Sequence, residues 1–148
     1  MSLTVFILGA GASREAGGPL MADFLDIADE LRKTQDLGDD KSSFDAVFKG
    51  ISALQTVHSK STLDVYNLES VFAAFEMASL FGRLGNLTSQ EIQGLSAAIR
   101  RLIVRTLDER IMLPVKGKTV SPSSPYQEFV SLVLGLHRSR HATSQNGA

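Results

Sequence analysis

The chain opens with Leu3-Thr-Val-Phe-Ile-Leu8, which leads directly into Gly9-Ala-Gly-Ala-Ser13 and then into Ala16-Gly-Gly-Pro19. The first run is apolar, β-branched and aromatic without a charge, and it predicts a buried strand over 3–8. Pro19 suits the first position of a helix because its φ is already fixed. A strand, a turn of small residues and a helix in this order let a backbone approach a phosphate closely. The start of the chain therefore predicts nucleotide binding in an α/β fold.

The composition is that of a folded globular protein of one domain. The 148 residues are 43% hydrophobic and 21% charged, with a net charge of −1. This balance favours neither nucleic acid nor a membrane surface as a partner. The charge is uneven, however: 1–82 hold 6 Lys/Arg against 12 Asp/Glu, and 83–148 hold 9 against 4. We interpret this as acidic and basic helices that face each other or solvent, with a basic surface for an anionic partner as the alternative.

The absence of cysteine excludes disulfides, thiol catalysis and cysteine-ligated zinc. No segment reaches the ~20 apolar residues that a membrane helix needs, and the run over 3–8 ends too early for a signal peptide. We therefore expect a cytoplasmic protein with no metal and no membrane contact.

Apolar residues at spacings of three and four predict that 20–112 is mostly helical. Asn67 is an expected N-cap, and Thr88 with Glu91 has the capping-box pattern. Phe72, Phe75 and Phe81 share one predicted helix and are interpreted as core residues. The expected helices are 20–31, 44–57, 67–85, 88–112 and 126–136.

Two regions complicate an α/β fold. The tail 137–148 is polar without periodicity and is expected to be disordered. A parallel strand over 3–8 needs neighbours for its backbone groups, and only 112–120 offers a weak candidate. The predicted sheet is therefore incomplete within this chain.

The glycine-rich turn departs from the general dinucleotide fingerprint. Gly9 and Gly11 have the expected spacing, but Arg14 stands where a third glycine is expected. No Gly-Lys-Ser/Thr follows, so the turn is not a P-loop. Taken alone, the pattern fits a tight strand-to-helix turn that needs small residues equally well.

The longer pattern, through Pro19, resembles the signature of the sirtuin superfamily. That resemblance implies that the turn lies against the diphosphate and ribose of NAD, while the second glycine pair and the proline close the cofactor loop. The residues that it assigns to NAD binding are Gly9, Ala10, Gly11, Ala12, Ser13, Gly17, Gly18 and Pro19.

Departures from the pattern indicate a branch of the superfamily. Protein-deacylating sirtuins continue with Asp-Phe-Arg and carry a four-cysteine zinc module, whereas this chain has Leu20-Met-Ala22 and no cysteine. It is more similar to the sirtuin-like bacterial NAD hydrolases and antiphage-defence proteins, which have helical insertions and no zinc. The segment Asn67-Leu-Glu-Ser-Val-Phe72 also resembles that branch. A protein-deacylase function is disfavoured.

The catalytic half of the superfamily pattern is missing. It contains a Thr-x-Asn-x-Asp segment after a core strand and a later histidine. The most similar segment is Thr143-Ser-Gln-Asn146. It follows His137-Arg-Ser-Arg-His141 instead of an apolar strand, and no aspartate follows it. We assign no catalytic role to this segment, nor to His58, His137 or His141.

The resemblance thus implies an incomplete, helix-rich, Rossmann-like sirtuin-type domain over 1–136. It would be the NAD-binding portion of a truncated hydrolase that converts NAD to ADP-ribose and nicotinamide, with NAD or NADP left open. One alternative is a non-enzymatic nucleotide-binding or interaction module in which the helical insertion forms a homo-oligomer. Another is a chain that does not fold by itself because its sheet is incomplete.

Overall fold

The computed structural model describes the backbone at residue 5, over 9–57 and over 63–145. The chain forms two compact units, Met1–Ile111 and Met112–Ala148. The first unit contains η1 (Ala10–Ala16), α1 (Phe24–Thr34), η2 (Gly38–Asp40), α2 (Lys41–Val57), α3 (Leu68–Phe81) and α4 (Ser89–Arg110). The second contains β1 (Val115–Lys116), β2 (Thr119–Val120) and α5 (Ser124–Gln145).

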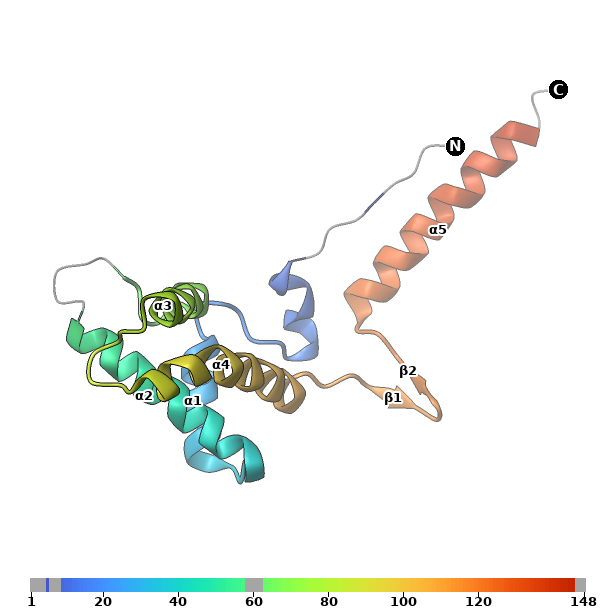
Figure 1. Ribbon diagram of the computed structural model, residues 1–148. Helices are drawn as coiled ribbons and strands as arrows, with labels where there is room; N and C mark the ends of the chain where they lie inside the picture. The colour runs from blue at the N-terminus through green and yellow to red at the C-terminus, as the bar shows by residue number, and fades with distance from the viewer. Residues whose placement is uncertain (1–4, 6–8, 58–62, 146–148) are drawn as a thin grey trace. The chain divides into compact units, whose positions relative to one another are not determined.

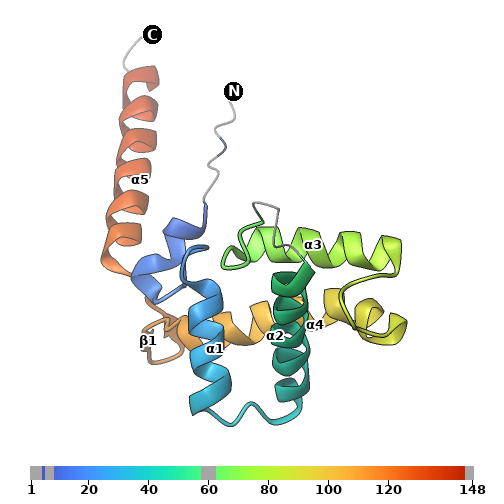
Figure 2. The same ribbon diagram turned by 90° about the vertical axis from the view of Figure 1, so that its left-hand side faces the viewer.

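The core of the first unit lies between helices. Figure 2 shows α1 and α2 side by side, with α4 crossing both and α3 packed along α4 (Figure 1). The apolar stripes of the four helices meet in one cluster, in which Phe44, Phe75, Ile99 and Leu102 are fully buried. Burial of these stripes against one another is the main stabilising contribution, because isolated helices of this length are marginal in water.

Local signals set the starts of α3 and α4 as predicted, whereas α3 ends four residues earlier than expected. The side chain of Asn67 accepts a hydrogen bond from the Ser70 N–H at 3.0 Å, and Gly82 ends α3 in the left-handed region at φ 64°. Thr88 N–H donates to Glu91 Oε2 at 2.8 Å, and Glu91 N–H donates to Thr88 Oγ1 at 3.3 Å. The predicted capping box is therefore confirmed.

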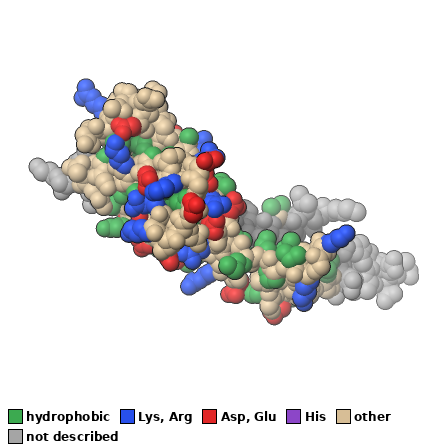
Figure 3. Space-filling view, turned by 90° about the horizontal axis from the view of Figure 1, so that it is seen from below, with side chains coloured by type: hydrophobic (Ala, Val, Ile, Leu, Met, Phe, Trp, Pro, Cys, Tyr) green, Lys and Arg blue, Asp and Glu red, His purple; other side chains and the backbone are tan. Residues whose placement is uncertain are grey.

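The uneven charge along the sequence becomes pairing between helices, which confirms that interpretation. Arg101 Nε lies 2.6 Å from Asp40, Arg110 Nη2 lies 2.6 Å from Glu30, and Arg100 Nη2 lies 3.4 Å from Glu76. On the face seen in Figure 3, acidic and basic side chains are interspersed. Most of these partners are exposed, so each pair contributes little by itself, about 0–1 kcal/mol.

The first two long helices begin at other residues than expected. Helix α1 begins at Phe24 instead of residue 20, after a turn in which Asp23 N–H donates to Leu20 O at 3.3 Å. Pro19 is buried, so the chain enters the helix from a fixed position. Helix α2 begins three residues before the predicted position, directly after η2.

In the second unit, the weak strand candidate over 112–120 forms a short hairpin. Val115 pairs with Val120 and Lys116 with Thr119 in antiparallel register, around Gly117 at φ 64°. Helix α5 continues to Gln145, through most of the tail that was expected to be disordered. No proline or glycine stands between His137 and Gln145, so nothing in the backbone chemistry ends the helix earlier.

The predicted Rossmann-like α/β fold is wrong. The described residues contain one two-stranded antiparallel sheet and no parallel pair, and the helices of the first unit pack on one another instead of on a sheet. The expected strand over 3–8 lies outside the described residues except for Val5, which is 70% exposed and in no strand. The apolar faces of the helices are covered by other helices, so the described part of the first unit needs no central sheet to bury them.

Candidate functional site

The residues assigned to NAD binding form one closed turn. Gly9 precedes η1, and its carbonyl accepts from the Ala12 N–H at 2.9 Å. At the other end, Gly17 N–H donates to Arg14 O and Gly18 N–H donates to Ser13 O, both at 2.9 Å. The structure therefore brings the two halves of the motif, Gly9–Ser13 and Gly17–Pro19, together in one short 3₁₀ helix and its cap.

The second glycine pair is required by packing within the first unit. Gly17 has φ 88°, and a Cβ there would overlap the carbonyl oxygen of Arg110 at the end of α4. A Cβ on the buried Gly18 would stand 2.5 Å from Ser13 Oγ. Gly17 lets the turn lie against the last residue of α4, and Gly18 lets the turn close on Ser13, so both glycines have a structural explanation.

The first glycine pair has no such explanation. A Cβ built on Gly9 or on Gly11 meets no heavy atom within 4 Å, and neither residue has a positive φ. Both are exposed. The described fold thus leaves open space beside the backbone at the two positions where the motif predicts contact with a diphosphate.

The turn carries one cation, Arg14. Arg14 is exposed and forms no ion pair with any residue that the structure describes. The neighbouring Arg110, by contrast, donates from Nη2 to Glu30 Oε2 at 2.6 Å. Arg14, the departure from the dinucleotide fingerprint, therefore supplies a positive charge at the exposed side of the turn.

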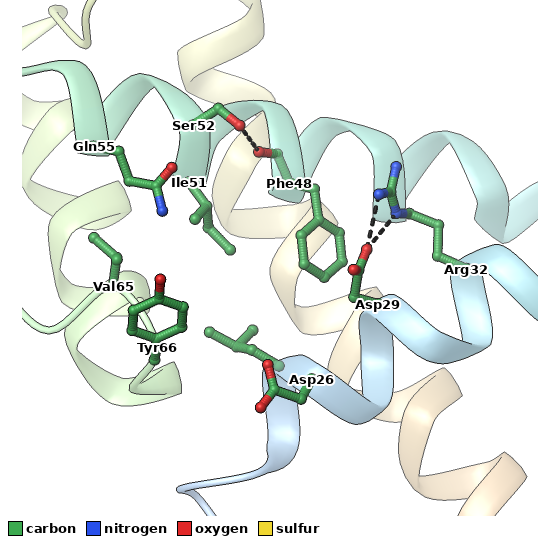
Figure 4. A pocket seen from close by; sticks show the side chains of 10 residues that line it. Asp26, Asp29, Arg32, Phe48, Ile51, Ser52, Gln55, Val65 and Tyr66 are labelled. Atoms are coloured by element: carbon green, nitrogen blue, oxygen red, sulfur yellow. Dashed lines mark hydrogen bonds and ion pairs between the residues drawn. The ribbon is translucent and has the colours of Figure 1, made fainter.

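Away from the turn, a hollow of about 260 Å³ lies between α1, α2 and the residues before α3. Figure 4 shows Phe48, Ile51 and Tyr66 turned toward it, with Asp29 and Arg32 side by side at one edge. The Arg32 guanidinium donates to Asp29 Oδ1 at 2.8 and 3.0 Å and lies 4.7 Å from the centre of the Phe48 ring. The lining of this hollow is mixed: Asp26, Ser52 and Gln55 also border it, beside the apolar side chains and the Asp29–Arg32 pair.

The charged groups at that edge hold each other in the ionised form. Burial raises the pKa of Asp29, but hydrogen bonds from Lys33 and Arg32 outweigh it, so the pKa is lowered overall. Arg32 also donates to Asp45 at 3.2 Å and thereby joins α1 to α2. The edge acts as a structural ion-pair network, and it presents no carboxyl with a raised pKa for acid catalysis.

The catalytic candidates of the sequence fall largely outside the described part. His58 and Asn146 lie outside the described residues, and His137, His141 and Thr143 are on α5 with side chains that are not described. Among the described residues there is no cluster of three or more metal-ligating side chains. None of the helices in the described ranges is both long enough and apolar enough to cross a bilayer.

Sequence reasoning missed an apolar groove of about 610 Å³ beside α3. Phe75 is fully buried, as expected, but Phe81 on the same helix is 72% exposed, so its assignment to the core is wrong. The signal that could have revealed this is that large apolar residues stand on more than one face of α3, which a helix with one buried face does not need.

Comparison with known proteins identifies no relative: no family model, no curated protein and no solved structure matches the chain.

Proposed function

We propose that the chain binds the diphosphate of NAD at the turn from Gly9 to Pro19. The contrast between the two glycine pairs carries this proposal. Gly17 and Gly18 serve packing, whereas Gly9 and Gly11 border open space and have negative φ. A glycine without an internal role still lets the backbone come within hydrogen-bonding distance of a phosphate, and this is the use that the dinucleotide motifs make of it.

Two further features support an anionic dinucleotide as the ligand. Arg14 offers a guanidinium that has no ion-pair partner among the described residues and that can donate two hydrogen bonds to a diphosphate. The resemblance of Gly9-Ala-Gly-Ala-Ser13 and Gly17-Gly-Pro19 to the sirtuin-type turn supports NAD within that class. The proposal concerns this turn and its ligand, without a parallel-sheet domain around them.

We further propose that the chain is the binding portion of a cytoplasmic NAD hydrolase and is catalytically incomplete. Cleavage of the ribose–nicotinamide bond needs groups that orient water and stabilise an oxocarbenium-like state. The segment Thr143–Asn146 lacks the apolar strand before it and the aspartate after it, which supports incompleteness. The lack of cysteine supports an intracellular location.

A thermal-shift titration of the full chain with NAD and ADP-ribose tests the binding proposal, with nicotinamide release measured on the same samples. Both ligands carry the diphosphate, so we expect both to stabilise the protein, by about 2.7 kcal/mol at a hundredfold excess over Kd. Nicotinamide alone should produce no shift. Release of nicotinamide from NAD would contradict catalytic incompleteness, and the absence of any shift would contradict binding.

The variant Gly11→Val tests the position of the ligand. A Cβ at Gly11 meets no heavy atom of the described protein within 4 Å and Gly11 is exposed, so the unliganded melting temperature should hardly change while the NAD shift is lost. Gly94→Val is the matched control, because Gly94 on α4 has equally open surroundings but lies outside the turn. An NAD shift that survives in Gly11→Val would refute the site.

A further inference from the structure

Helix α3 carries an apolar face that the described protein does not cover. Its buried side contributes Leu68, Val71 and Phe75 to the core, but Met77, Leu80 and Phe81 are 50, 81 and 72% exposed. A helix that is apolar on both sides is typical of one that is buried on both sides. This face therefore needs an occupant.

The exposed face adjoins the apolar groove. We call this surface the α3 groove; its walls include Leu54, Ala73, Ala74, Met77, Phe81 and Leu84. Large exposed side chains and small ones thus lie on the same helix, next to a space of about 610 Å³. Arg83 is the one charged side chain among the lining residues of this groove.

The order of large and small side chains along α3 fits the same face of a second copy of α3 that runs in the opposite direction. When two antiparallel copies of a helix pair about residue 77, a residue four positions after this centre meets one about four positions before it. Phe81 of one copy then lies on Ala73 of the other, and Leu80 lies on Ala74. A large side chain meets an alanine at both ends of the contact, which allows the helix axes to approach to about 8–10 Å.

The charges match the same arrangement. Glu69 lies in the first turn of α3 and Arg83 lies two residues after its end; both are exposed, and neither forms an ion pair with a residue that the structure describes. Antiparallel pairing brings Glu69 of each copy near Arg83 of the other. The neighbouring acid, Glu76, already accepts from Arg100 at 3.4 Å, so it limits the apolar face on that side.

We propose that the α3 groove is the interface of a homodimer in which two copies of α3 pack antiparallel about Met77. The interface is isologous, because every contact is made twice across one two-fold axis. It is independent of the proposed NAD turn.

Mass measurement by light scattering or sedimentation tests the proposal on the full chain. We expect twice the chain mass of 16.0 kDa at micromolar concentration. Phe81→Glu should give a monomer with an unchanged melting temperature of the monomeric fold, because this side chain is already exposed. Val104→Glu is the matched control on α4, where the exposed fraction is 58%, and it should remain a dimer. A monomeric wild type, or a dimeric Phe81→Glu variant, would overturn the proposal.

Charge reversals and single-cysteine variants distinguish this dimer from binding of another protein and from other dimers. Glu69→Arg and Arg83→Glu should each weaken dimerisation roughly tenfold or more through like charges, and the double variant should restore it.

The chain has no cysteine, so Met77→Cys introduces a single thiol at the two-fold axis. It should form a disulfide-linked dimer on mild oxidation, whereas Val104→Cys should not. Failure of the double variant to recover, or equal cross-linking of both thiols, would contradict antiparallel pairing.

Discussion

Two glycines in the middle of helices provide a sharp test of the core. Gly50 on α2 is buried, and a Cβ there would stand 2.7 Å from Cζ of Phe75 and 3.0 Å from Cδ2 of Leu95. Gly94 on α4 is exposed, and a Cβ there would meet no heavy atom within 4 Å. The substitutions Gly50→Ala and Gly94→Ala therefore make the same chemical change in opposite surroundings.

The expected magnitudes follow from two opposing effects. Replacing glycine by alanine inside a helix stabilises it by about 1 kcal/mol, and this gain is common to both variants. At Gly50 the fully buried ring of Phe75 must move, and such overpacking costs about 1–3 kcal/mol. We expect Gly94→Ala to be about 1 kcal/mol more stable than wild type and Gly50→Ala to be about 2 kcal/mol less stable than Gly94→Ala.

Urea unfolding followed by circular dichroism measures this difference from the two midpoints at a common slope. For a unit of this size the gap corresponds to roughly 8 °C or more in melting temperature. Equal stabilities of the two variants would refute the close crossing of α2, α3 and α4 at Gly50. A destabilised Gly94→Ala would refute the open surroundings of that residue.

Two other predictions concern the core and the pH dependence. Leu102→Ala should lose about 3 kcal/mol in the same urea assay because Leu102 is fully buried, while Val104→Ala two residues later should stay within about 0.5 kcal/mol of wild type. Hydrogen bonds from Lys49 and from Thr88 lower the pKa of Glu91 from 4.5 to about 2. Folding that lowers a carboxyl pKa is stabilising above pH 4.5, and the stabilisation is lost as the pH falls toward 2. Glu91→Gln should therefore melt lower than wild type at pH 7 and approach it near pH 2; a constant gap over that range would contradict the role of this carboxylate.

The sequence was most informative where structure depends on neighbours along the chain. The cap at Asn67, the end of α3 at Gly82 and the pairing of Thr88 with Glu91 each involve residues within four positions of one another. Hydrogen bonds of this kind are available as soon as the helix forms, so residue identity and spacing predict them. The existence of α2, α3 and α4 was predictable for the same reason.

Contacts between residues distant in sequence could not be predicted in this way. The motif at the start predicts a strand and a parallel sheet, but a strand needs other strands, and their presence is a property of the whole chain. The motif also could not show which of its glycines are structural, because the atoms that exclude a side chain at Gly17 belong to Arg110, 93 positions away in the sequence. Only the fold separates this pair from Gly9 and Gly11.

By itself, then, the sequence determined that α1 to α4 form and how α3 and α4 are capped at their starts, because these features arise from contacts within a turn or two. Tertiary structure alone decided which helix face is covered. Phe75 and Phe81 share a helix and an apolar periodicity, yet one is enclosed by α2 and α4 and the other is exposed. The periodicity of the sequence indicates that a helix face is apolar, whereas the burial of that face depends on whether another segment packs against it.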